Sequence, residues 1–163
     1  MNMQTRYWRF LVQIKAWIFY LDIYADKSYK WEKRLNIWLA ISSSSSIAAW
    51  AIWNEYGLIW AILIAVAQVI TAIKPQLPFN KRLELIKPFL TDLQLLFNKV
   101  DYNWHKVSQG ELNEGEINDL LFDFRNSYTE METKNLKSSE LITNKEIIRI
   151  ADKRTDEFFR ANY

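Results

Sequence analysis

The sequence predicts an all-α membrane protein, and three observations support this fold class. The chain has 163 residues, half of them hydrophobic, with only 3 Gly and 3 Pro; an all-β chain with many tight turns needs more of both. Two long segments near the middle of the chain carry no charge. Apolar residues recur at helical spacing in most of the remainder. The length indicates a single domain.

The charge-free segments cover residues 35–53 and 58–73. At 1.5 Å per helical residue, the first spans roughly 28 Å, close to the thickness of a bilayer core. Only residues 54–57 join the two, so the helices must be antiparallel neighbours. We therefore predict a two-span transmembrane hairpin over residues 31–75. A buried hairpin in a soluble bundle is the alternative, because a run of five serines and a short second segment are weak for membrane helices.

Basic residues lie on both outer sides of the predicted hairpin, and its connection has none. The positive-inside rule then places both termini in the cytoplasm. Trp residues near both ends of the spans fit the aromatic belts of a membrane protein. The basic residues are Lys15, Lys27, Lys30, Lys33 and Arg34 before the first span, and Lys74, Lys81, Arg82 and Lys87 after the second.

Residues 1–30 are predicted to form an amphipathic helix rich in aromatic side chains. Its apolar face recurs at spacings of three and four. The helix could lie on the inner leaflet with this face in lipid, or pack the same face on later helices. The predicted fold adopts the first, an N-terminal interfacial helix. The face consists of Tyr7, Leu11, Ile14, Ile18 and Leu21.

A cytoplasmic antiparallel helical hairpin is predicted over residues 79–135, with its turn in the polar stretch 108–115. Its first helix carries a seam at steps of three and four, the pattern of a coiled coil or helical bundle. Pro88 should kink this helix or break its first turn. Residues 136–163 should hold a last helix that begins at the capping-box pattern of residues 143–146. The seam, expected to hold a bundle or an oligomer together, is Leu83, Ile86, Leu90, Leu93, Phe97, Val100 and Trp104.

Catalytic and metal chemistry have few candidates in this chain. It has no Cys and one His, which excludes disulfides, thiolate metal sites and thiol nucleophiles. His105 is expected to be structural or solvated, and Asp119 with Asp123 fits an exposed charged helix face. The balance of 21 basic and 19 acidic residues argues against nucleic-acid binding. We therefore expect no enzyme activity, no cofactor, no metal and no sequence-specific nucleic-acid binding.

Small and polar residues form a stripe inside the predicted spans. Small residues let helices approach closely, and a Ser hydroxyl can bond its own i−4 carbonyl, so helix packing within or between hairpins is one interpretation. The amide of Gln68 should face protein or water, which makes the stripe a candidate oligomer contact or pore wall. The stripe consists of Asn36, Ser43 and Ser46 on the first span and Ala61, Ala65, Gln68 and Ala72 on the second.

The layout resembles the SLATT family of bacterial two-transmembrane effectors over about residues 20–135. It combines an amphipathic helix, the basic lead-in Lys30-Trp31-Glu32-Lys33-Arg34, a tight two-span hairpin and a long cytoplasmic helical hairpin. The resemblance implies an effector of anti-phage and conflict systems at the bacterial inner membrane. It also implies a sensor partner, such as a reverse transcriptase, a nucleotidyltransferase or a nucleotide-binding protein. It carries over no catalytic residues.

Three functions fit these predictions. The leading hypothesis is a non-enzymatic effector that forms homo-oligomers and permeabilises the bacterial inner membrane when infection triggers it. A second is a membrane-anchored scaffold or regulatory subunit whose cytoplasmic helices dock a partner. A third is a subunit of a small-ion channel. All three place the hairpin in the bilayer and differ in whether the spans conduct.

Overall fold

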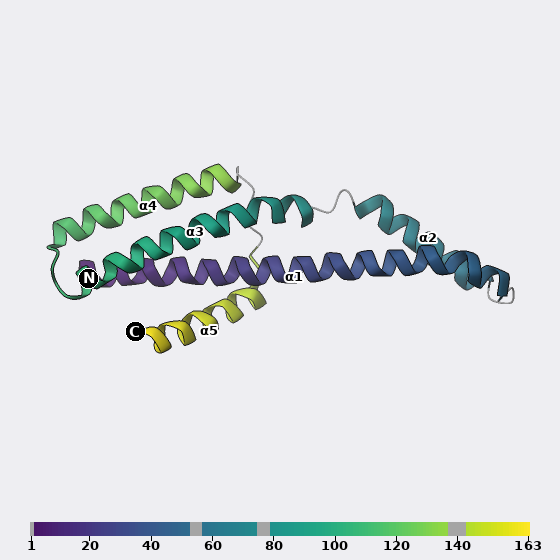
Figure 1. The fold of residues 1–163 in the computed structure, drawn as a ribbon, viewed down its shortest axis with the longest axis horizontal. Coiled ribbons are helices and arrows are strands. Elements are labelled where there is room, and N and C mark those ends of the chain that lie inside the picture. The colour runs from purple at the N-terminus through teal and green to yellow at the C-terminus, as the bar shows by residue number, and fades with distance from the viewer. Residues whose placement is uncertain (1, 53–56, 75–78, 137–142) are drawn as a thin grey trace. The chain divides into compact units, whose positions relative to one another are not determined.

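The structure, a computed structural model, describes residues 2–52, 57–74, 79–136 and 143–163; of residues 43–52, 57, 60 and 79–81 it describes the backbone alone. Within these ranges the chain is helical and contains no strand, as predicted. The helices are α1 (Met3–Ile52), α2 (Gly57–Ile73), α3 (Phe79–Ser108), α4 (Glu114–Leu136) and α5 (Lys145–Asn162) (Figure 1).

The helices form two compact units. The bundle unit comprises residues 1–25 and 84–163, and the hairpin unit comprises residues 26–83. Helix α1 belongs to both, because it runs unbroken from Met3 to Ile52, where the sequence predicted an amphipathic helix and a separate span. Between residues 25 and 52 there is neither Gly nor Pro to end the helix, which explains its continuity.

The bundle unit packs α3, α4 and α5 around the first half of α1 (Figure 1). The predicted apolar face of α1 lies at its centre, and its members Tyr7, Leu11 and Leu21 are fully buried. Protein side chains therefore cover this face. The prediction that this face lies on lipid as an interfacial helix is therefore wrong. The alternative, that the face packs on later helices, is what the structure has.

Helix α3 passes through Pro88 without ending. Proline removes one backbone donor, yet the neighbouring side chains of Ile86 and Phe89 are fully buried and keep this part of α3 in the core. The break that was one expectation for Pro88 is therefore absent from the described helix, and the kink that was the other stays a prediction.

The α3–α4 turn is built by two local motifs. Gly110 has a φ of 72°, its N–H bonds the Val107 carbonyl, and the next N–H bonds the Lys106 carbonyl, which together make a Schellman motif. Asn113 then caps α4: its side chain accepts from the Glu116 N–H at 3.0 Å, and its own N–H donates to the Glu116 carboxylate at 2.8 Å. This capping box fixes where α4 begins.

Helix α5 begins at Lys145, and Asn144, inside the predicted capping pattern, is its N-cap. The Asn144 side chain accepts from the N–H groups of Glu146 and Ile147. Its backbone N–H donates to the Tyr20 hydroxyl at 3.1 Å, which ties the start of α5 to α1. The buried residues Ile147, Ala151, Thr155 and Phe159 recur every four residues and form the packed face of α5.

The hairpin unit contains the second half of α1 and all of α2. The ammonium of Lys74 donates a hydrogen bond to the side chain of Asn36, which brings the end of α2 beside this part of α1. Among the residues that the structure describes, no helix is both long enough and apolar enough to cross a membrane.

Candidate functional site

Helix α2 exposes large apolar side chains over most of its described surface. Leu58 is 77 % exposed and Val69 is 56 % exposed, and no charged residue occurs from Gly57 to Ile73. A contiguous apolar surface of this kind marks a contact with lipid or with other protein. The large exposed side chains are Leu58, Ile59, Ile62, Leu63, Ile64, Val66, Val69 and Ile73.

Of the predicted stripe, Asn36 contacts the end of α2 inside the hairpin unit through its hydrogen bond with Lys74. The described members of the stripe are all exposed, whereas the less exposed α2 side chains are Ala67 and Ile70. None of the residues that the structure describes hydrogen-bonds the amide of Gln68. The side chains of Ser43 and Ser46 lie outside the described residues. The exposed members are Asn36, Ala61, Ala65, Gln68 and Ala72.

From Ile86 to Trp104 the predicted seam of α3 lies inside the bundle unit, while Leu83 belongs to the hairpin unit. Its contacts are made within the chain: Val100 accepts a hydrogen bond from the Tyr7 hydroxyl at 2.8 Å, and Phe97 lies 6.0 Å from Phe158 between ring centroids. These contacts occupy the seam, so it does not offer a surface to a second copy. Leu83, Ile86, Leu93, Phe97 and Val100 are buried, and Leu90 and Trp104 are partly buried.

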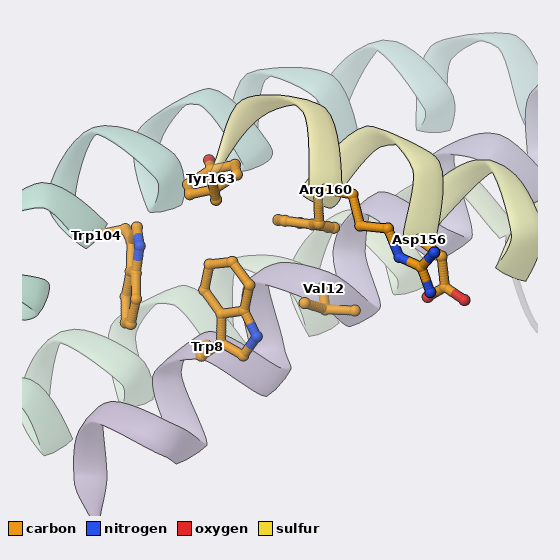
Figure 2. Close-up of a pocket in the computed structure, with 7 residues that line it drawn as sticks. Trp8, Val12, Trp104, Asp156, Arg160 and Tyr163 are labelled. Carbon is orange, nitrogen blue, oxygen red and sulfur yellow. The ribbon is translucent and has the colours of Figure 1, made fainter.

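A second surface feature, which we call the aromatic hollow, opens on the bundle unit between α1, α3 and α5. It has a volume of about 620 Å³. Figure 2 shows the rings of Trp8, Trp104 and Tyr163 at one end and the charged groups of Asp156 and Arg160 at the other. Its lining residues are Trp8, Val12, Trp104, Asp156, Phe159, Arg160 and Tyr163.

The rings of the aromatic hollow hold one another in place. The ring centroid of Trp8 lies 4.9 Å from that of Trp104, 5.0 Å from that of Phe159 and 5.2 Å from that of Tyr163. The Tyr163 hydroxyl also hydrogen-bonds the Asp101 carboxylate. Edge-to-face and tilted pairs at these distances are favourable beyond their burial. The rings therefore form a preformed surface that spans three helices.

The charges of the aromatic hollow are available for a contact. Asp156 and Arg160 are exposed, and within the described part of the chain neither has an ion-pair or hydrogen-bond partner. They stand one turn apart on α5, with Tyr163 three residues further along the same side. The sequence prediction missed this surface: the spacing of these three residues puts them on one side of α5, but only the packing of α1 and α3 beside them forms the hollow.

Lys15 occupies a different place from the one its charge suggested. The sequence predicts Lys15 among the basic residues beside the membrane. Its ammonium lies instead in the bundle unit, 3.9 Å from the ring centroid of Phe158 and 4.4 Å from that of Phe97. Burial lowers the pKa of Lys15, and the nearby Asp101 carboxylate opposes that shift. Burial likewise raises the pKa of Asp101, against the effect of Lys15. Cation–π contacts stabilise the ammonium there.

The groups considered for chemistry are exposed on α3 and α4. His105 is exposed and its ring Nε2 lies 3.2 Å from the side-chain nitrogen of Gln109. Asp119 and Asp123 are exposed on α4. Over the described ranges, no three or more His, Asp or Glu side chains are grouped to hold a metal ion.

No protein-family model, curated protein or solved structure matches this chain. The resemblance to the SLATT family in layout stays a prediction.

Proposed function

We propose that this protein is a non-enzymatic membrane effector. The hairpin unit inserts into lipid, copies of the chain assemble, and the assembly permeabilises the membrane. The observation that carries the proposal is the apolar surface of α2, which exposes eight large apolar side chains and has no charged residue. On the likeness in layout to the SLATT family, the proposal includes the bacterial inner membrane as the site of this activity, both termini in the cytoplasm and a sensor partner as the trigger.

The energetics favour a covered α2. Burying a Leu, Ile or Val side chain contributes about 1.5–3 kcal/mol, so the exposed side chains together favour a covered state by on the order of 10 kcal/mol or more. Lipid supplies such cover without a specific partner. The basic residues at positions 30, 33 and 34, just before the charge-free part of α1, are exposed and suit an anionic lipid surface.

Gln68 connects insertion to permeabilisation. Its exposed amide lies on the same line of α2 as Ala61, Ala65 and Ala72, and an amide in the bilayer core must face protein or water. When copies pack through their small residues, this line becomes the contact between hairpins or the wall of a water path.

A membrane-anchored scaffold is the second candidate. The aromatic hollow favours it, because a preformed aromatic and charged surface on a folded bundle is suited to docking another protein. In that function the hairpin unit is an anchor only, and the membrane stays sealed.

Dye release from loaded vesicles separates the two functions. At high concentration, which promotes assembly in place of the trigger, the purified chain should release dye. Gln68→Leu should bind vesicles equally and release less, because leucine is favourable in the bilayer core and cannot line a water path. Gln94→Leu, which changes an exposed glutamine on α3, is the matched control and should behave as wild type. A wild-type chain that binds vesicles and never releases dye would support the scaffold. Equal release by all three proteins would show that Gln68 lines no water path.

A further inference from the structure

We propose that the aromatic hollow is a contact between two copies of this chain, made by antiparallel pairing of α5 with the partner's α5 about a two-fold axis. The inference rests on the proposed function in one respect only, since an effector that assembles needs a surface on which copies meet. It names that surface on the bundle unit and does not depend on how the hairpin unit meets lipid.

The surface has the composition of an interface centre. Trp, Tyr and Arg are the residue types that contribute most to association between proteins, and the hollow contains Trp8, Trp104, Tyr163 and Arg160. Tyr163 is 52 % exposed although it contacts three other aromatic or acidic groups. The seam of α3 is already buried inside the chain, so assembly of the bundle units needs a surface such as this one.

Charge identifies a second copy as the occupant. A two-fold contact is self-complementary, because the same patch of each copy meets the other. If the axis passes between positions 156 and 160 of α5, Asp156 of each copy faces the partner's Arg160, and two ion pairs form around the rings. A charged patch can pair with its own copy about a two-fold axis only if it carries both signs, and Asp156 and Arg160 supply one of each.

The two charges do not neutralise each other within α5. The spacing of four residues would permit an ion pair inside the helix, and such a pair joins Lys153 to Glu157 at 3.7 Å one turn away. The structure has none between Asp156 and Arg160, neither of which has a partner among the described residues. The Asp156 carboxylate and the Arg160 guanidinium both remain available to the partner copy.

The contact is expected to be weak in isolation. The hollow is lined by the seven residues named above, whereas a stable interface usually involves about 20–30 residues on each side. When copies share one membrane, their effective concentration rises and a weak contact is sufficient. The association should therefore be measured over a wide concentration range.

Sedimentation equilibrium of the full-length chain in a neutral detergent tests the pairing. Arg160→Asp and Asp156→Arg should each weaken self-association by about tenfold or more, because each puts like charges opposite one another twice. The double variant, Asp156→Arg with Arg160→Asp, should restore association to within about threefold of wild type. An equimolar mixture of the two single variants should form the mixed dimer. Asp123→Arg and Lys134→Glu on α4 are matched charge reversals at exposed positions and should have no effect.

Each result decides the proposal. Association that is unchanged in the single variants would show that copies meet elsewhere. Weak association in the double variant and in the mixture would exclude the two-fold pairing. A wild-type chain that stays monomeric throughout would assign the hollow to a different protein or to none. These variants leave the hairpin unit untouched, so vesicle binding and dye release by the wild-type chain report separately on the proposed function.

Discussion

The two units of this protein treat apolar side chains in opposite ways. In the bundle unit, Tyr7, Leu11, Leu93 and Val100 are fully buried. In the hairpin unit, α2 carries an even more apolar sequence and exposes it, with Leu58 at 77 %. In the bundle unit, other parts of the chain bury the apolar side chains, whereas most large apolar side chains of α2 are buried by nothing in the described chain.

The difference has a local origin in the sequence. In α3 and α5, charged and polar residues separate apolar ones at spacings of three and four, so each helix has one face for the core and one for water. Helix α2 has no polar face. A helix without a polar face is stable only when other apolar groups surround it, which is the reason for proposing that lipid covers α2.

Two charges placed in the middle of α2 should have the largest effect on this comparison. An aspartate at the centre of a membrane helix costs about 2.5–3.5 kcal/mol, so Ile62→Asp with Val66→Asp should reduce vesicle binding by more than about a thousandfold. Flotation with vesicles measures the bound fraction. Phe122→Asp, at a 61 % exposed position on α4, is the control and should bind as wild type. Equal loss in both proteins would remove the distinction between the units.

A core truncation should have the next largest effect, on the bundle unit. Leu93 is fully buried and Leu95, two residues away on α3, is 56 % exposed. Leu93→Ala should lower the free energy of unfolding by about 2–5 kcal/mol, while Leu95→Ala should change it by less than about 0.5 kcal/mol. Denaturant titration followed by circular dichroism measures both. If the two variants lose the same stability, the side of α3 that packs in the core has been misassigned.

Loss of a helix cap should have a smaller effect. The Asn144 side chain satisfies two N–H groups at the start of α5, and replacing such a cap by Ala usually costs about 1 kcal/mol. Asn144→Ala should therefore unfold at a lower denaturant concentration than wild type. Asn126→Ala, at an exposed position inside α4, is the control. A control variant that loses as much stability would show that the loss has another cause.

Tyrosine burial should make the bundle unit sensitive to alkali. Burial raises the pKa of Tyr7, and burial together with Glu132 raises the pKa of Tyr128 to about 12. A raised pKa means that the folded state binds the hydroxyl proton more tightly than the unfolded state does. The stability that this difference contributes is present below pH 10.0, the ordinary pKa of tyrosine, and is lost as the pH rises above that value. Tyr7→Phe should lose about 1 kcal/mol at neutral pH with its hydrogen bond to Val100.

Because Tyr7→Phe lacks the titrating hydroxyl, its free energy of unfolding should fall less than that of wild type between about pH 8 and pH 11. Denaturant titrations at both values test this, with Tyr102→Phe on an exposed ring as control. A wild-type chain whose free energy of unfolding is the same at both values would contradict the expected alkaline loss.

The sequence predicted the helical elements better than the places where they meet. Spacing located the buried face of α1 and the seam of α3, because a repeat of three and four is a local property. It did not decide whether the face from Tyr7 to Leu21 meets lipid or protein, since both bury apolar side chains. The junction inside α1 was also missed, because a change of surroundings need not break a helix that lacks Gly and Pro.

The aromatic hollow could not be found from spacing alone. Trp8, Trp104 and Tyr163 lie far apart in the sequence and meet only when α1, α3 and α5 pack together. Lys15 is a similar case: its charge suggested a position beside the membrane, yet Phe97 and Phe158 hold its ammonium in the bundle unit. Long-range packing decides both.

Quenching by lipid chains tests most directly whether α2 is covered by a bilayer. The chain has no Cys, so Val66→Cys on α2 and Phe122→Cys on α4 each place one fluorescent label. In vesicles whose acyl chains carry bromine, the label at position 66 should be strongly quenched and the label at position 122 should not. Equal, weak quenching at both positions would contradict the account and show that the apolar surface of α2 is covered by something other than lipid.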